Sequence, residues 1–377
     1  MERKKILMLL SNPFMVDPRV SREAKSLVDY GHEVTVIVWD RKGDYPSEDI
    51  IDGIRIIRIH NNLLMKIMPN DLFRNPLWWR RAYKKGLELY KSGQFKFDVV
   101  HCHDLDTLQS GVWLKKKLGL KLIYDAHEIF GYMIARDMPK FIVGVALRME
   151  KRLVKKVNRV ITVNEPLRDY FRSISNTPIT VVMNCNDLVS QEYIPPRNDA
   201  FTVCYIGVLT KSRMFPEIVD ILGKIKGVRF VIAGKKENLY AEVKERCEKY
   251  DTVEFLGAIP FCDVIQKTLE AHIVACMINP KDLNNRIGIA NKQFEAMACG
   301  RPILCTKETY SGAMTDELKC GLSIDYDKDA LHNAILKLRD DPELCEEFGR
   351  TGLKAAKEKY NWNKQAEKLL KVYETRK

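Results

Sequence analysis

The stretch FDVVHCHDLDTLQSGVWLKKKLGLKLIYDA (Phe97–Ala126) contains the pattern that decides the fold. Two short apolar runs, Phe97–His101 and Lys121–Ala126, enclose a segment, Leu108–Leu118, in which apolar residues recur at helical spacing. A strand, a helix and a second strand of these lengths form the crossover unit of a parallel sheet. Because the apolar runs are nearly continuous, both faces of that sheet are expected to be covered.

The same alternation recurs along the chain, with one interruption. Further strands are predicted at Lys5–Leu10, Glu33–Trp39, Ile54–Ile59 and Arg159–Asn164, and then at Phe201–Val208, Arg229–Gly234, Val253–Gly257, Ile273–Met277, Pro302–Thr306 and Gly321–Asp325. The paired prolines of Gln191–Ala200 indicate a linker between the two sets. We therefore expect an α/β protein of two doubly wound parallel-sheet domains that face across a cleft, where such sheets bind ligands. The expected domains are residues 1–190 and 191–360, with a final helix over 361–377 that packs back on the first domain.

The composition indicates a protein of a reducing compartment, and it predicts no membrane-spanning segment. The 10 cysteines are scattered singly, a pattern that favours reduced, mostly buried thiols in a cytosolic protein. Basic residues precede the first apolar run, but that run, Ile6–Leu10, is too short for a signal peptide. Nowhere does the chain approach the roughly 20 apolar residues that span a bilayer. We expect a cytoplasmic protein.

Positive charge is concentrated in the first half of the chain. The net charge is +12, and residues 1–200 contain 33 basic and 24 acidic residues. A basic surface binds nucleic acid, an anionic membrane or phosphorylated substrates. No nucleic-acid module is recognisable, so a nucleic-acid partner is not expected.

Two basic segments raise the question of a membrane surface. Leu63–Gly93 mixes cations with Trp78, Trp79 and Tyr83, which is compatible with a peripheral contact at the inner face of an anionic membrane. A solvated helix with an apolar packing face explains it equally well. Pro139–Arg159 is also basic and amphipathic, and its apolar side is expected to pack on the sheet.

Histidines and acids end two neighbouring strands of the first domain. His101, His103 and Asp104 follow one strand, and His127 follows the next. Since parallel strands end at one edge of a sheet, these groups are expected in one crevice. A metal site, a polar substrate site and histidines that merely cap strand ends all remain open. Asp17 before Pro18 predicts a helix N-cap, and no GxGxxG follows the first strand, so a dinucleotide site in this half is not expected.

The loop after the first strand of the second domain reads YIGVLTKSRMFPEIV (Tyr205–Val219). Gly207 allows close backbone approach, and Lys211 and Arg213 precede the next helix. Cations at a helix N-terminus form an anion site, although ordinary loop charges are the alternative.

The most informative stretch is RIGIANKQFEAMACGRPIL (Arg286–Leu304). Asn291 is predicted to cap a helix. Lys292 lies in the first turn, against the helix dipole, and this placement makes sense if a phosphate binds there. Glu295 lies one turn later on an apolar face, where a ribose diol would supply hydrogen-bond donors. An ordinary solvated lysine and an exposed or salt-bridged acid are the alternatives.

Taken together, these motifs resemble the retaining glycosyltransferases of the GT-B fold, family 4. The matching segments are Asp17–Ile37, Asp98–Leu108, Leu122–Glu128, Tyr205–Arg213, Asn291–Leu304 and Tyr360–Trp362. The order and spacing of the motifs make the resemblance specific, and it covers nearly the whole chain. It implies two Rossmann-like domains and transfer of a sugar from a nucleotide-diphosphate sugar to a glycan or polyprenyl-linked acceptor in cell-envelope polysaccharide or glycoconjugate synthesis.

The resemblance also assigns roles to residues. Glu295 matches the acid that binds ribose hydroxyls, and Arg213 matches the basic residue that binds the diphosphate. The expected binding residues for a UDP- or GDP-sugar are Gly207, Lys211, Arg213, Asn291, Lys292 and Glu295. The expected catalytic residues are His127, which matches the histidine facing the transferred sugar, together with Arg213 and Lys292. The expected acceptor-side residues are Asp17, Arg19, His103 and Asp104.

The implied reaction is that of a hexosyltransferase-type enzyme without a required metal or other cofactor. Fixed cations and helix N-termini would stabilise the leaving diphosphate, and no enzymic nucleophile is nominated because attack is expected on the front face.

Three positions depart from the family pattern. Ile287 stands where many members carry a second Glu that contacts the sugar. Ala290 replaces a common proline, and Val208 replaces a common arginine, which leaves more of the diphosphate charge to Arg213 and Lys292.

Three other functions compete with this interpretation. A UDP-sugar 2-epimerase-like isomerase needs further acids and histidines at the sugar, yet the second domain has only His272 and His332. A metal-dependent hydrolase would use His101, His103, Asp104 and His127, and metal content would reveal it. A non-catalytic homologue is suggested by Ile287.

Overall fold

The computed structural model describes residues 2–15, 17–68, 70–196, 199–237 and 239–374. Residues 197–198 of the expected linker, residues 375–377 of the expected final helix and residue 69 of the basic segment lie outside that set. The chain forms two compact units, Met1–Met183 with Ala366–Lys377, and Asn184–Gln365. Each unit is described by itself.

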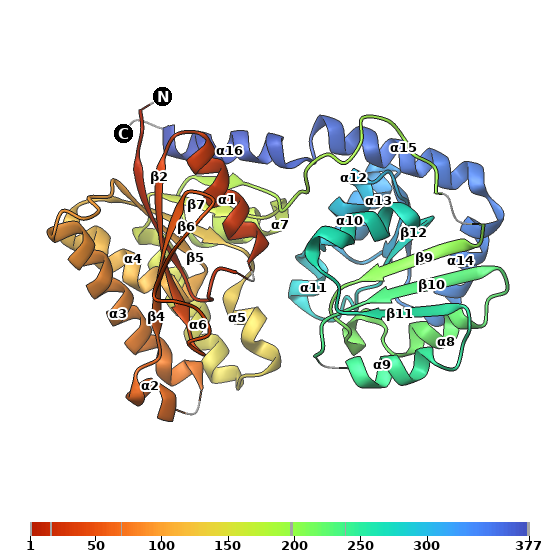
Figure 1. Ribbon diagram of the computed structural model, residues 1–377, viewed down its shortest axis with the longest axis horizontal. Helices are drawn as coiled ribbons and strands as arrows, with labels where there is room; N and C mark the ends of the chain where they lie inside the picture. The colour runs from red at the N-terminus through yellow and green to blue at the C-terminus, as the bar shows by residue number, and fades with distance from the viewer. Residues whose placement is uncertain (1, 16, 69, 197–198, 238, 375–377) are drawn as a thin grey trace. The chain divides into compact units, whose positions relative to one another are not determined.

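The first unit is built on an eight-stranded sheet (Figure 1) with strand order β3-β4-β2-β1-β5-β6-β7-β8. Its strands are β1 (Lys5–Leu10), β2 (Glu33–Asp40), β3 (Glu48–Ile51), β4 (Ile54–His60), β5 (Val99–His103), β6 (Lys121–Ala126), β7 (Arg159–Thr162) and β8 (Ile179–Val181). The six predicted strands are confirmed. The expected parallel sheet is confirmed, with one additional strand at its edge, β3, that pairs antiparallel with β4.

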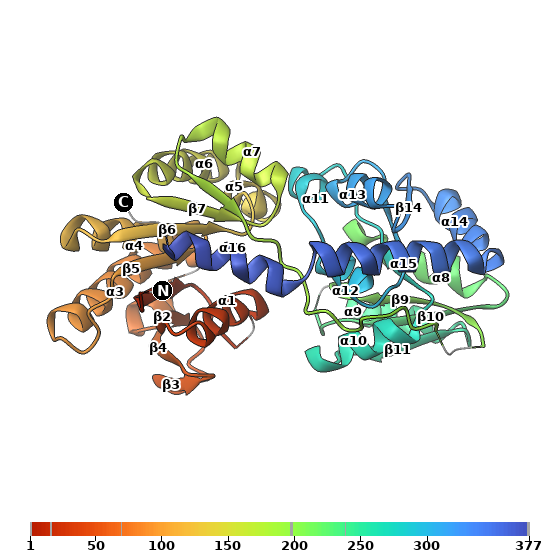
Figure 2. The same ribbon diagram turned by 90° about the horizontal axis from the view of Figure 1, so that it is seen from above.

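Helices connect these strands. They are α1 (Pro18–Asp29), α2 (Leu63–Ile67), α3 (Asp71–Lys91), α4 (Leu105–Leu118), α5 (Phe130–Met133), α6 (Lys140–Leu153) and α7 (Glu165–Ile174), with 3₁₀ turns η1 (Ile134–Arg136) and η2 (Val154–Lys156). As predicted, Asp17 caps α1, because its Oδ1 accepts from the Val20 N–H at 3.1 Å and Pro18 is the first helical residue. The last part of α16 (Trp362–Glu374) belongs to this unit and lies beside α1 (Figure 2).

The tryptophans of the basic segment belong to the core of the first unit. Trp78 is fully buried and stacks on Trp39 with ring centroids 5.3 Å apart. Trp78 and Trp79 both donate from Nε1 to the Asp106 carbonyl, at 3.1 and 2.7 Å. For Trp78, the alternative of a helix with an apolar packing face is therefore the one that the structure supports. The exposed apolar side chains of this segment are Leu63, Leu64, Ile67 and Phe73.

Helix α6 also differs from its expectation. Ala146 and Leu153 pack inward, but Phe141 and Val145 are 67% and 52% exposed. Only part of its apolar side covers the unit's core.

The second unit is built on a six-stranded sheet with strand order β11-β10-β9-β12-β13-β14, parallel throughout the described pairings (Figure 1). Its strands are β9 (Phe201–Ile206), β10 (Val228–Ala233), β11 (Val253–Gly257), β12 (Ile273–Cys276), β13 (Ile303–Thr306) and β14 (Gly321–Ile324). Its helices are α8 (Glu217–Gly223), α9 (Tyr240–Cys247), α10 (Phe261–Glu270), α11 (Leu283–Ile287), α12 (Asn291–Ala298), α13 (Tyr310–Leu318), α14 (Lys328–Asp340) and α15 (Pro342–Glu358), with the 3₁₀ turn η3 (Lys211–Arg213). All six predicted strands of this half are confirmed.

The cysteines follow the prediction of unpaired, mostly buried thiols. All 10 lie among the described residues, all are free, and Cys262 is the exposed one.

We predict that Trp78 carries a large share of the first unit's stability. Trp78→Ala removes a fully buried ring, so it should lower the free energy of unfolding by roughly 3–5 kcal/mol. Phe73→Ala, a change at a 55% exposed side chain of the same helix, should stay within about 0.5 kcal/mol of the parent. Urea unfolding of both variants measures the difference. Equal, small effects would contradict the placement of Trp78 in the core.

Candidate active site

The loop that follows β9 brings a lysine against a glycine. Gly207 follows β9 directly, and a Cβ added to it would lie 2.8 Å from Lys292 Nζ. The same Nζ lies 4.5 Å from the ring centre of Tyr205, whose hydroxyl donates to the Val208 carbonyl at 2.6 Å. Gly207 therefore leaves the space that the Lys292 side chain occupies.

A second cation of this region has an unused hydrogen-bond donor. The Nη1 atom of Arg213, in η3, is buried and has no partner within the described part of the chain. Burial raises the pKa of the Cys276 thiol, and the positive charges of Lys292 and Arg213 oppose that rise. Both cations thus act on one neighbourhood. Neither Arg213 nor Lys292 forms an ion pair with a described acidic side chain. The third cation of this region, Lys211, is exposed.

Helix α12 starts without a side-chain cap. Ala290 is the N-cap residue and Asn291 is the first helical residue. The prediction that Asn291 caps the helix is therefore wrong, and its Oδ1 instead accepts from Asn184 Nδ2 at 2.8 Å. Lys292 does lie in the first turn, as predicted. An open helix N-terminus beside two cations is suited to an anion such as a diphosphate.

Glu295 follows one turn later and is 7% exposed. The alternative of an exposed acid is therefore wrong. A buried carboxylate offers strong acceptors, which match the two hydroxyl groups of a diol.

The first unit holds a buried network where β5 and β6 end. His103 pairs in register with Asp125, and the rings of His101 and His103 stack with centroids 4.4 Å apart. Helix α1 contributes Arg19 and Glu23, and all five side chains are buried. Adjacent parallel strands and one covering helix thus bring together residues that are far apart in the sequence.

Arg19 neutralises this network. Its Nη2 lies 3.0 and 3.2 Å from the two carboxylate oxygens of Asp125, and 2.9 Å from Glu23 Oε1. Its Nη1 donates to the Val182 carbonyl at 2.9 Å. Burial alone would raise the pKa of Asp125, but the Arg19 charge holds it well below its usual range. Burial raises the pKa of Glu23, so Asp125 is the principal counter-ion of Arg19.

Asp104 holds His127. Its backbone lies in the left-handed region with φ 57°, a conformation that is strained for a residue with a Cβ. One carboxylate oxygen accepts from the His127 N–H at 3.0 Å, and the other lies 3.3 Å from His127 Nδ1. On the other side of the ring, His127 Nε2 lies 3.5 Å from Asp125 Oδ2. Each ring nitrogen therefore faces a carboxylate.

These carboxylates favour a protonated His127 ring. Burial lowers its pKa, but Asp104 and Asp125 raise it by more, to about 10. Burial lowers the pKa of His103 to about 3, and it also lowers that of His101. The network thus contains one imidazolium and two neutral imidazoles. The His127 side chain is 17% exposed, whereas those of His101 and His103 are fully buried.

Two family models match the chain. The model "Glycosyltransferase Family 4" matches residues 19–189, and "Glycosyl transferases group 1" matches residues 200–341. The chain belongs to the family-4 type of glycosyltransferases.

Solved structures show that this glycosyltransferase has the GT-B fold. Sucrose-phosphate synthase from Thermosynechococcus elongatus superposes with a TM-score of 0.77 at 17% identity, over 98% of each chain. HepE from Anabaena, solved in complex with UDP and glucose, superposes with a TM-score of 0.72 at 15% identity, over 98% of this chain and 99% of HepE.

Curated relatives are distant in sequence. One component of the human phosphatidylinositol N-acetylglucosaminyltransferase is 22% identical over 95% of this chain and 72% of its own length. An uncharacterized glycosyltransferase of Methanocaldococcus jannaschii is 23% identical over 93% of this chain and 91% of its own length.

The structure divides the predicted site residues of this glycosyltransferase into two groups. Gly207, Lys211, Arg213, Asn291, Lys292 and Glu295 lie in the second unit, and Asp17, Arg19, His103, Asp104 and His127 lie in the first. In the second unit, Arg213 and Lys292 lie in one neighbourhood. In the first unit, Asp17 caps α1 and Arg19 forms the buried ion pair, so both residues order the unit rather than face solvent.

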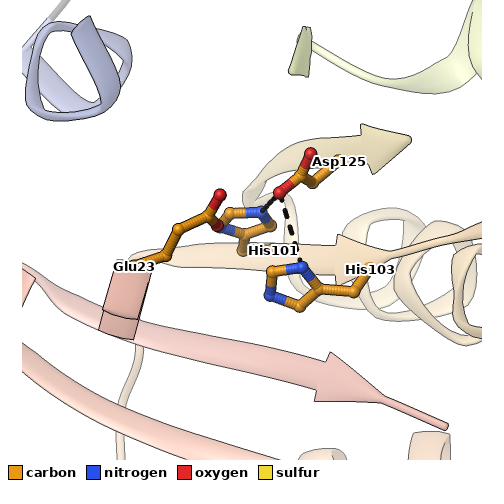
Figure 3. A group of neighbouring side chains, drawn as sticks. All are labelled: Glu23, His101, His103 and Asp125. Carbon is orange, nitrogen blue, oxygen red and sulfur yellow. Dashed lines mark ion pairs between the residues drawn. The ribbon is translucent and has the colours of Figure 1, made fainter. Parts of the chain in front are cut away.

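The residues that could hold a metal ion differ from those named for the competing metal-dependent hydrolase. Glu23, His101, His103 and Asp125 place potential ligand atoms within 4.8 Å of one another (Figure 3). However, Arg19 already contacts both carboxylates, and His101 Nδ1 is hydrogen-bonded to the Tyr373 hydroxyl at 2.5 Å. A metal ion would compete with a guanidinium for the same oxygens. The arrangement favours an ion-pair network over a metal centre.

Sequence reasoning missed three members of this network. Glu23 and Asp125 lie inside the matching segments Asp17–Ile37 and Leu122–Glu128, but no role is assigned to them from the sequence. The i,i+4 spacing of Arg19 and Glu23 is the signal that could have indicated their ion pair. Tyr373 is 272 residues from His101 and gave no signal.

We predict that the His127 ring stays protonated far above the usual histidine range. In nitrogen-15 NMR of the ring, wild type should titrate near pH 10, as the pKa of about 10 requires. Asp104→Asn removes one of the two carboxylates, so the pKa should fall toward about 6.5. A wild-type midpoint near 6.5, or an unchanged midpoint in Asp104→Asn, would contradict the assignment.

Proposed function

We propose that this glycosyltransferase is a retaining, metal-independent hexosyltransferase-type enzyme that uses a UDP- or GDP-sugar donor. Its acceptor is a glycan or a lipid-linked molecule of cell-surface polysaccharide or glycoconjugate synthesis. The observation that carries the proposal is the pair of unneutralised cations, Arg213 and Lys292, beside the uncapped start of α12.

The donor site follows from charge. Arg213 and Lys292 bind the diphosphate, with Gly207 and Asn291 lining it and Lys211 at the exposed side. Glu295 accepts hydrogen bonds from the two ribose hydroxyls. HepE, which shares the fold, has been solved with UDP and with UDP-glucose, and this supports a nucleotide-sugar donor.

The reaction breaks the bond between the sugar C1 and the phosphate oxygen. The electron pair leaves with the nucleoside diphosphate, whose growing charge Arg213, Lys292 and the N–H groups of α12 stabilise without a metal. The acceptor hydroxyl attacks on the face that the phosphate leaves, and the phosphate oxygen takes its proton. This course retains the anomeric configuration and requires no enzymic nucleophile.

His127 contributes as a fixed cation. With a carboxylate at each ring nitrogen it is neither a base nor a free hydrogen-bond donor, so we assign it charge stabilisation toward the transferred sugar. His103 and Asp104 orient it.

A lipid-linked acceptor has two supports. The human relative is named for transfer to phosphatidylinositol. Apolar side chains also protrude from the first unit, since Leu63 and Ile67 of α2 are 79% and 71% exposed. None of the described helices is long and apolar enough to cross a bilayer. We propose that α2 and the start of α3 insert peripherally into the surface of the cell membrane that faces the cytoplasm.

Donor binding should appear as thermal stabilisation. At about 100 times its dissociation constant, the correct donor should add about 2.7 kcal/mol of stability. Testing UDP-, GDP-, ADP- and dTDP-sugars with and without EDTA identifies the nucleotide. Glu295→Gln should reduce the stabilisation by about 1.4 kcal/mol for each tenfold loss of affinity, whereas Glu242→Gln, at an exposed acid of α9, should not. No stabilisation by any nucleotide, or a stabilisation that EDTA abolishes, would refute the metal-independent donor site.

The membrane contact should depend on α2. Leu63→Ser with Ile67→Ser should weaken binding to phospholipid vesicles by at least about tenfold, because two apolar side chains no longer leave water. Ile50→Ser, at a 74% exposed apolar residue of β3, is the matched control. Vesicle flotation measures both variants. Equal binding by both would show that α2 does not touch the membrane.

A further inference from the structure

A depression on the first unit is lined by cations and aromatic rings. It lies between α3 and α4, has a volume of about 470 Å³ and is lined by Arg80, Tyr83, Lys84, Trp113, Lys116 and Lys117. Tyr83 and Trp113 meet edge to face with ring centroids 5.8 Å apart. Both rings are half-buried, so they form an apolar floor under four charged side chains.

The four cations have no acidic partner among the residues that the structure describes. The lining contains no acidic residue, and none of the four forms an ion pair within the part of the chain that the structure describes. By contrast, the neighbouring Lys85 is paired with Glu88 at 3.1 Å. Unpaired like charges around one depression repel each other, and a bound anion would relieve that repulsion.

Helix stability does not explain the cluster. Lys116 and Lys117 lie in the last turn of α4, where cations are favoured by the helix dipole. Arg80 and Lys84 lie in the middle of α3 at i,i+4 spacing, where like charges destabilise a helix. Their placement opposite Lys116 and Lys117 therefore points to a ligand rather than to the fold.

The chemistry of the lining selects an anion attached to an apolar group. Tyrosine and tryptophan rings are favoured where an apolar body meets a charged, wet surface. Helix α3 also has the exposed Phe73 in its first turn, and the preceding helix α2 has the exposed Leu63. We propose that this depression, the α3–α4 pocket, binds the phosphate headgroup of an anionic phospholipid at a membrane surface. This inference rests on the proposed membrane contact and deepens it, because it gives that contact a lipid preference.

Vesicle flotation with charge-neutralised variants tests the proposal. The probes are vesicles of phosphatidylcholine alone and of phosphatidylcholine mixed with phosphatidylglycerol. Wild type should prefer the mixed vesicles. Lys84→Gln with Lys116→Gln should lose that preference, by roughly fivefold for each cation removed. Lys244→Gln with Lys249→Gln, an equal charge change at exposed positions of the second unit, should keep it. Thermal stabilisation by the donor should be the same in all three proteins and shows that they are folded.

Each alternative outcome has a distinct meaning. If the Lys84 and Lys116 variant still prefers the mixed vesicles, the proposed lipid site in the α3–α4 pocket is overturned. In that case the membrane contact still stands, provided that the Leu63 and Ile67 variant loses vesicle binding. No binding of wild type to either vesicle overturns both, while donor stabilisation continues to report on the transferase. If inorganic phosphate abolishes the wild-type preference for the mixed vesicles while binding to the phosphatidylcholine vesicles stays intact, the lipid source is overturned and a simple anion site remains. If wild type binds a polynucleotide in preference to the mixed vesicles, the assignment of a phospholipid to the pocket is also overturned.

Discussion

The first unit depends on the buried ion pair between Arg19 and Asp125. A buried charge without its partner costs several kcal/mol, so each side chain requires the other. Arg19 reaches Asp125 from α1 and also donates to the Val182 carbonyl beyond β8, which ties the covering helix to two places on the sheet. Asp125 in turn lies 3.5 Å from both His103 and His127. The protonated state of the one partly exposed histidine therefore follows from a pair that solvent does not reach.

In the second unit, the cations of the candidate site are not paired with acidic side chains of the described structure. Arg213 retains a buried nitrogen without a partner in the described structure, and Lys292 is placed over Tyr205 and against Gly207 instead of beside an acid. Desolvated donors without acceptors destabilise a free protein, and they persist where a ligand supplies the acceptors. The contrast separates two kinds of polar cluster in one chain. Arg19 lies within ion-pair distance of Glu23 and Asp125, although its Nε and both Glu23 oxygens have no hydrogen-bond partner in the described structure, whereas Arg213 and Lys292 form no ion pair with a described acidic side chain.

Much of the fold could be predicted because buried parallel strands leave a continuous apolar signal. The strands that escaped prediction, Glu48–Ile51 and Ile179–Val181, are short and only partly buried, so their sequences carry no such run. The site was predictable where a role depends on local spacing, as for Lys292 in its helical turn. It was not predictable where tertiary packing decides. Asn291 lost the capping position to an extended Ala290, and Tyr373 reaches His101 from the far end of the chain.

The basic segment shows why composition alone misplaces a membrane surface. Trp78 and Arg80 are two residues apart on α3, so they point in different directions, and only the packing decides which one meets solvent. Trp78 fills the core against Trp39, while Arg80 joins the cations of the α3–α4 pocket. The aromatic residues that first indicated a membrane thus divide into a structural group and a surface group. The surface group is Tyr83, which lines the α3–α4 pocket, and the apolar residues of this segment that reach solvent are Leu63, Leu64 and Ile67 on α2 and Phe73 in the first turn of α3. An amphipathic surface helix attaches a protein through the side chains that folding leaves outside, so the proposed membrane contact involves those side chains.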